Sequence, residues 1–186
     1  MVNTTLSRHS DPTAPTTSVL FLGGTRSGKS ALAESMTASI AESTGAPVTY
    51  VATGPGADPS MADRIAAHQV RRPSTWATEE VGVALAPALD TIVGVALVDS
   101  LGTWVAAHHD FEIDLDEMIA ALYRRFERGQ PTILVSDEVG MGVHPATELG
   151  NRFRDVLGEV NAAVALAVDE ARLVVAGRVL LLHRPD

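Results

Sequence analysis

Short apolar runs alternate along the chain with longer segments in which apolar residues recur every three or four positions. The runs are typical of buried strands, and they occupy residues 19–22, 48–52, 94–99, 132–136, 173–177 and 179–182. The longer segments are typical of helices, and they occupy residues 31–43, 60–71, 81–89, 114–128 and 147–168. This alternation predicts one α/β domain over residues 18–186, in which helices flank a mainly parallel central sheet.

Several details of these elements follow from their residue types. Pro87 is expected to interrupt the third of the helices, because proline lacks a backbone donor. Trp76 and Trp104 are assigned to packing, and His108 with His109 to a solvated loop. The apolar side of the last helix is expected to consist of Phe153, Val156, Leu157, Val160, Val164 and Leu166.

The stretch GGTRSGKS at residues 23–30 fits the phosphate-binding pattern G-x-x-x-x-G-K-[ST]. A strand pattern precedes it and a helical pattern follows it, which is the context that this motif requires. Lys29 is the only lysine among the 14 basic residues of the chain, and a compact ammonium fits among phosphate oxygens where a guanidinium does not. The sequence therefore predicts a single P-loop NTPase domain of the RecA-like kind, with nucleotide contacts from Gly23, Gly24, Thr25, Arg26, Ser27, Gly28, Lys29 and Ser30.

Acidic residues follow two of the later strands. Asp99 ends the apolar run at 94–99, as in the Walker B arrangement, so Asp99 and the Ser30 hydroxyl are the predicted Mg²⁺ ligands. Asp137 and Glu138 follow the strand at 132–136 and enter a glycine-containing loop. Ligands of open α/β sheets bind at such strand ends, although a tight turn with solvated acids is an alternative interpretation.

One predicted helix carries a basic face. His68 lies four residues after Arg64, and either Arg71 or Arg72 follows three or four residues later. Residues at these spacings share one side of the helix at 60–71. By itself this pattern is more typical of an exposed helix histidine among solvated arginines than of a catalytic one.

Composition excludes several classes of protein. The formal net charge of −9 argues against a nucleic-acid-binding surface, and the lack of cysteine excludes disulfides and thiolate metal sites. No apolar run approaches the length of a membrane span. Residues 1–17 lack the apolar core of a signal peptide and are expected to form a disordered leader, which favours a cytoplasmic protein.

Taken together, several blocks resemble the family of bifunctional adenosylcobinamide kinases and adenosylcobinamide-phosphate guanylyltransferases of cobalamin synthesis. The blocks are GGTRSGKS at 23–30, YVAT at 50–53, MxxRIxxHxxxRPxxW at 61–76, DSLGTWV at 99–105, EVGMGVxP at 138–145, FRD at 153–155 and GxxN at 158–161. The resemblance extends from about residue 18 to residue 182, and the block containing RIxxHxxxRP and the EVGMG block are its most specific parts.

This resemblance implies two reactions on one corrinoid. ATP or GTP first phosphorylates adenosylcobinamide, and GTP then gives GMP to His68, from which it passes to the phosphorylated corrinoid. Mg²⁺ is the predicted cofactor, and the resemblance also implies a homo-oligomer, with a trimer as its expected form. Arg64 and Arg72 are expected to bind phosphate charge, and Glu79 and Glu138 complete the nucleotide-binding candidates.

Two positions depart from the family pattern, which usually has asparagine where Asp137 stands and an acid where Ser60 stands. An added negative charge at position 137 is expected to alter nucleotide contacts or the placement of Mg²⁺. Two other interpretations of the sequence remain open at this point, namely a P-loop kinase of another small molecule and a non-catalytic GTP-binding switch or assembly protein.

Overall fold

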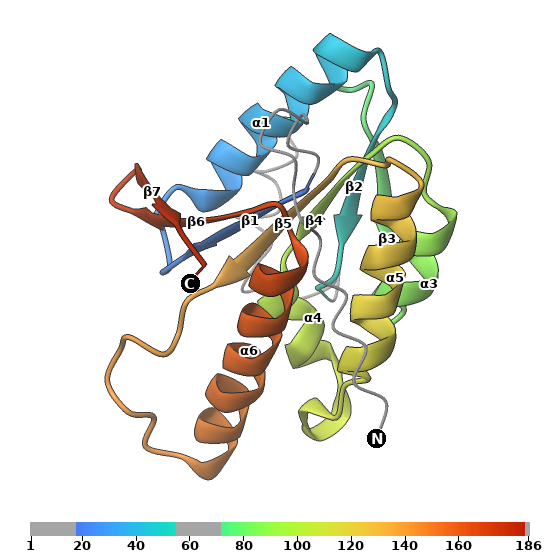
Figure 1. Cartoon of the computed structure of the whole chain (residues 1–186). Helices are drawn as coiled ribbons and strands as arrows, with labels where there is room; N and C mark the ends of the chain where they lie inside the picture. The colour runs from blue at the N-terminus through green and yellow to red at the C-terminus, as the bar shows by residue number, and fades with distance from the viewer. Residues whose placement is uncertain (1–17, 55–71, 185–186) are drawn as a thin grey trace.

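A computed structural model describes residues 18–54 and 72–184 of the chain. Within these residues lies a seven-stranded sheet of order β3-β2-β4-β5-β1-β6-β7, parallel except for β7, which runs antiparallel to β6 (Figure 1). The strands are β1 (Ser18–Gly23), β2 (Val48–Ala52), β3 (Ala77–Glu80), β4 (Val95–Asp99), β5 (Thr132–Asp137), β6 (Glu170–Val175) and β7 (Arg178–Leu182). The helices are α1 (Lys29–Thr44), α3 (Leu85–Thr91), α4 (Leu101–Ala107), the 3₁₀ turn η1 (His109–Phe111), α5 (Leu115–Glu127) and α6 (Glu148–Ala167).

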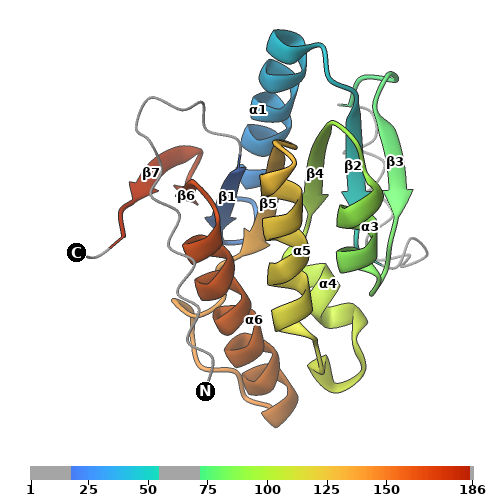
Figure 2. The same ribbon diagram turned by 45° about the vertical axis from the view of Figure 1, so that its right-hand side comes forward.

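Both faces of the sheet are covered. Successive side chains of a strand point to opposite faces, and in β1 Leu20 and Leu22 join one core cluster whereas Val19 and Phe21 join another. The first cluster is completed by α3, α4, α5 and α6, and the second by α1, so the helices form two layers around the sheet (Figure 2). Burial on both faces explains why the central strands are continuous apolar runs rather than alternating ones.

The order of the strands determines which residues meet at the site. Strand β5 lies between β1 and β4, and its register pairs Asp137 with Gly23 on one side and Val135 with Asp99 on the other. Because these strands are parallel, their carboxyl ends share one edge of the sheet. The P-loop and the two acidic strand ends therefore lie along the same edge.

Most predicted elements of the described residues are found, and three observed elements, β3, α4 and the turn η1, were not predicted. Strand β3 has the sequence ATEE and all four residues are exposed, so it has no apolar run to signal it. Helix α4 is short and begins with a capping box in which the Ser100 side chain accepts a hydrogen bond from the Thr103 amide. The predicted helix at 60–71 lies outside the described residues.

Two detailed predictions were wrong. Helix α3 begins at Leu85 and contains Pro87 without interruption, since Pro87 is in the first turn, where backbone N–H groups have no partner within the helix. Leu166 is 63% exposed and does not belong to the apolar side of α6, whose last turn instead buries Ala167. Trp104 is 2% exposed and packs in the core, as predicted.

The two histidines after α4 lie at η1 rather than in an irregular loop. The His109 side chain is 93% exposed, as a solvated segment requires. By contrast, His108 is partly buried, and its Nδ1 lies 2.9 Å from the carbonyl oxygen of Trp104.

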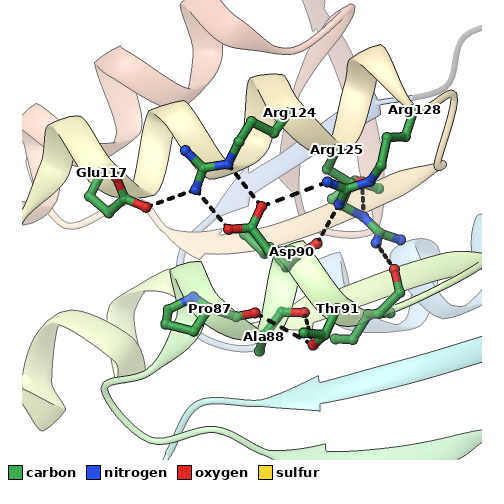
Figure 3. A network of polar contacts seen from close by, with 11 residues as sticks. Pro87, Ala88, Asp90, Thr91, Glu117, Arg124, Arg125 and Arg128 are labelled. Carbon is green, nitrogen blue, oxygen red and sulfur yellow. Dashed lines mark hydrogen bonds and ion pairs between the residues drawn. The ribbon is translucent and has the colours of Figure 1, made fainter.

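Neighbouring arginines attach α5 to the rest of the domain in different ways (Figure 3). Arg124 is half-exposed and forms an ion pair with Asp90 of α3, with 2.8 Å between Nη2 and Oδ2. Arg125 is fully buried, and its guanidinium donates to the Thr132 hydroxyl and to backbone carbonyls. The carbonyl acceptors are those of Ile92, Gly94 and Pro131. Arg125 thereby joins α5 to the chain segments that enter β4 and β5.

Candidate functional site

The P-loop joins the end of β1 to the first residue of α1, as the motif predicts. Gly28, just before α1, has a φ of 98°, a conformation that strongly favours glycine. A Cβ at Gly23 would lie 2.5 Å from the carbonyl oxygen of Val174 and 2.6 Å from Oγ of Ser27. The loop is therefore folded so closely against β6 that Gly23 has no room for a side chain.

The turn between β6 and β7 supports the P-loop from outside the motif. The Gly177 amide donates to the carbonyl oxygen of Ser27 at 2.8 Å. Ala176 and Gly177 both have positive φ, 49° and 74°, as in the tight turns that close two-residue hairpins. Sequence reasoning missed this contact, because nothing in the hairpin's residue types indicates what it packs against.

Lys29 lies at the centre of the site. The residue is 7% exposed, and its Nζ donates to the carbonyl oxygen of Gly24 at 3.3 Å. Nζ also forms an ion pair with Oδ1 of Asp137 at 2.7 Å. The sequence placed Asp137 at the binding edge of the sheet, but it did not identify Asp137 as the partner of Lys29.

Asp99 belongs to a second cluster, two strands away from the P-loop strand. The Tyr50 hydroxyl donates to Oδ2 of Asp99 at 3.2 Å, and the Arg72 guanidinium stacks 3.4 Å above the centre of the Tyr50 ring. Burial, and then the charge of Asp99, raise the pKa of Tyr50, so this hydroxyl stays a donor. The cluster thus ties Arg72 to the neighbourhood of Asp99.

The chemistry of the available donors fits Mg²⁺. Ser30 is partly exposed in the first turn of α1, and Asp99 and Asp137 supply carboxylates at the same edge of the sheet. Hydroxyl and carboxylate oxygens are the hard ligands that Mg²⁺ prefers, with waters and substrate phosphates completing its shell. Among the described residues no group of three or more His, Cys, Asp or Glu side chains is arranged to hold a metal ion by itself.

Glu138 is turned toward its own loop. Its Oε1 accepts hydrogen bonds from the amides of Gly140, at 2.6 Å, and Met141, at 3.2 Å. The Glu138 amide donates to the carbonyl oxygen of Gly23 at 3.1 Å, which fixes the start of the loop beside the P-loop. The loop beyond it carries the exposed apolar side chains of Met141 and Val143.

Asn161 of α6 holds the end of β5. Its side-chain oxygen accepts from the Ser136 hydroxyl at 2.6 Å, and its side-chain nitrogen donates to the carbonyl oxygen of Asp137 at 3.0 Å. The GxxN block at 158–161 was a signal for this residue, but the sequence did not reveal its role.

The remaining predicted residues are not all part of this arrangement. Glu79 lies on the exposed edge strand β3, opposite Val51 of β2. A surface hollow of about 230 Å³ lies beside β3 and is lined by Arg72, Pro73, Ser74, Trp76 and Thr78. Arg64 and His68 lie outside the described residues.

The fold and the phosphate loop define a RecA-like P-loop nucleotide-binding protein. In fold, the chain is similar to the flagellar accessory protein FlaH from Methanocaldococcus jannaschii, with a TM-score of 0.52 and 14% identity over 88% of this chain and 74% of that one. More specifically, the chain belongs to the cobinamide kinase / cobinamide phosphate guanyltransferase family, whose sequence profile matches residues 19–182. This finding confirms the resemblance seen in the sequence.

Two relatives show the extent of the similarity. The chain is 40% identical over 164 residues to the bifunctional adenosylcobalamin biosynthesis protein CobP of Pseudomonas aeruginosa, covering 85% of this chain and 92% of that protein. It is 34% identical over 181 residues to the bifunctional adenosylcobalamin biosynthesis protein CobU of Salmonella typhimurium, covering 86% and 96% respectively. In the part of the chain that the structure describes, no helix is long and apolar enough to cross a membrane.

Proposed function

We propose that this protein phosphorylates adenosylcobinamide with ATP or GTP and then transfers GMP from GTP to the phosphorylated corrinoid, giving adenosyl-GDP-cobinamide. The observation that carries the proposal is the buried Lys29 at the centre of a complete P-loop, in a chain of this family. Because its substrates include nucleoside triphosphates, we propose that it acts in the cytoplasm.

In the first reaction the chain mainly positions the nucleotide and offsets charge, which is what phosphoryl transfer requires. The backbone N–H groups of residues 24–29 bind phosphate oxygens, and Lys29 donates to the phosphoryl group that is transferred. Ser30 and Asp99 would hold Mg²⁺, which neutralises phosphate charge when bound. The corrinoid hydroxyl attacks the γ-phosphorus and releases its proton to water, the bond to the β-phosphate oxygen breaks, and the nucleoside diphosphate leaves.

In the second reaction His68 is the nucleophile. A neutral imidazole nitrogen attacks the α-phosphorus of GTP, an N–P bond forms, and pyrophosphate leaves. A phosphate oxygen of the corrinoid then attacks the same phosphorus and breaks the N–P bond, which restores the imidazole. Arg64 and Arg72 are proposed to stabilise the phosphate charge, and Glu79 and Glu138 to contact the nucleotide.

Labelled GTP tests this proposal directly. The protein is incubated with Mg²⁺ and GTP labelled on the α or the γ phosphate and then denatured. We expect acid-labile α label on the protein, and its loss in His68→Ala with much of the kinase activity retained. His109→Ala is the matched control, because that imidazole is exposed and far along the chain from the motif. Transfer of γ label to a small molecule without an adduct would indicate a simple kinase, and hydrolysis or binding alone a switch.

We also propose that the protein is a homo-oligomer, with a trimer as the expected form. Strand β7 supports this, because it is an edge strand with four consecutive exposed apolar residues: Val179, Leu180, Leu181 and Leu182. Light scattering should give the mass of several chains for the unmodified protein and a smaller mass for Leu180→Arg. The control is Val93→Arg, at an exposed position outside β7. An unchanged mass in Leu180→Arg would exclude β7 as the contact.

A further inference from the structure

The ion pair between Lys29 and Asp137 places a negative charge inside the phosphate-binding loop. The 2.7 Å separation of Nζ and Oδ1 is that of a charge-assisted hydrogen bond, and the lysine side chain is 8% exposed against 34% for the aspartate. The ammonium that is to bind phosphate is thus already bonded to a carboxylate of the same chain.

The carboxylate of Asp137 has little freedom to move away. Its backbone is paired with Gly23 in the sheet, and its carbonyl oxygen accepts from Asn161 at 3.0 Å. Its second oxygen faces α4, where a Cβ on Gly102 would lie 2.9 Å from Oδ2. One oxygen therefore points to the P-loop lysine, while the other packs against the first turn of a helix.

A fixed carboxylate at this position affects metal-free and metal-bound nucleotides differently. A metal-free nucleoside triphosphate brings several negative charges to within a few ångströms of Asp137, in a partly buried site where such repulsion is weakly screened. A nucleotide complexed with Mg²⁺ carries less charge and presents a cation for which carboxylate oxygens are suitable ligands, directly or through water.

We infer that Asp137 is a specificity-determining residue that makes the P-loop select the Mg²⁺ complex of the nucleotide over the metal-free nucleotide, and that it keeps Lys29 in place before the phosphates arrive. This inference rests on the proposed nucleotide-binding function. It assigns to Asp137 a role that differs from those of Ser30 and Asp99, because Asp137 alone among the three contacts the lysine in the described residues.

The test is a binding measurement that needs no turnover. A fluorescent GTP analogue is titrated into the protein with excess Mg²⁺ and, separately, with excess EDTA. The unmodified protein should bind the analogue at least about tenfold more tightly with Mg²⁺ than with EDTA. In Asp137→Asn, which keeps the shape and an oxygen acceptor for Lys29, binding in EDTA should tighten by about tenfold while binding in Mg²⁺ changes much less.

Glu127→Gln is the matched control, since it also removes one negative charge, but at the exposed end of α5 that leads into the opposite end of β5. It should leave the ratio of the two dissociation constants unchanged. If Asp137→Asn does not fold, Asp137→Ser gives the same measurement with a smaller uncharged side chain.

The possible failures are distinguishable. If the unmodified protein does not bind the analogue under either condition, the proposed nucleotide function is wrong. If it binds equally well with and without Mg²⁺, or if loss of the carboxylate shifts both affinities by the same factor, nucleotide binding stands and the role inferred for Asp137 is overturned.

Discussion

Replacing Arg125 with methionine should destabilise the domain strongly. The change keeps a long flexible stem but leaves three buried acceptors without their donor, namely the carbonyl oxygens of Ile92 and Gly94 and the hydroxyl oxygen of Thr132. A buried acceptor left unpaired costs about 2 kcal/mol, so the three together cost about 6 kcal/mol.

Part of that cost is offset by removing a buried charge. Burial lowers the pKa of the Arg125 guanidinium from 12.5 to about 10, and each pKa unit corresponds to about 1.4 kcal/mol. Removing the buried guanidinium therefore stabilises the domain by about 3 kcal/mol. The net expectation is that the free energy of unfolding falls by about 3 kcal/mol. In a domain of this size that loss lowers the melting temperature by about 6–12 °C.

Urea unfolding followed by circular dichroism measures this free energy. Arg124→Met is the matched control, because it makes the same substitution at the preceding residue of α5, where the guanidinium is half-exposed and its pair with Asp90 is solvated. Its effect should be much smaller. If the two variants lose similar stability, or if Arg125→Met is as stable as the unmodified protein, the argument from unpaired buried acceptors is refuted.

Two further substitutions test other parts of the fold. Ala176→Gly should raise the free energy of unfolding by up to about 1 kcal/mol, because glycine adopts the φ of 49° without strain. The melting temperature should rise slightly as a result, and a lower melting temperature would contradict this. The hydrogen bond from Arg124 holds the pKa of Asp90 below its ordinary value of 3.8. The stabilisation from this ion pair is therefore present above about pH 4, and it is lost as the pH falls through the lowered pKa of Asp90. Asp90→Asn should therefore reduce stability to urea at about pH 7, and the difference should shrink at about pH 3; a constant difference would exclude the ion pair as its cause.

The fold could be predicted from the sequence where burial leaves a pattern. The central strands are covered on both faces, so each is an apolar run, and the amphipathic pattern of α5 follows from its one buried side. Strand β3 left no such pattern, because it is polar and lies exposed at the edge of the sheet. Pro87 was misjudged because the start of α3, and hence the place of the proline in the first turn, depends on packing rather than on local sequence.

The phosphate-binding loop could likewise be predicted, because its residues are contiguous and the geometry of such loops follows from their glycines. The pairing of Lys29 with Asp137 could not, since it requires β5 to lie beside β1 across more than a hundred intervening residues. The roles of Asn161 and Gly177 depend on the same long-range arrangement, which no local pattern encodes.

The amide of Gly177 has a consequence for how this chain tolerates shortening. A protein that ended before residue 176 would retain all eight residues of the GGTRSGKS motif. The carbonyl oxygen of Ser27 would nevertheless lose the Gly177 amide that donates to it. We expect such a truncation to weaken nucleotide affinity although no residue of the motif has changed. The final hairpin and the first loop, at opposite ends of the polypeptide, are in this respect a single functional unit.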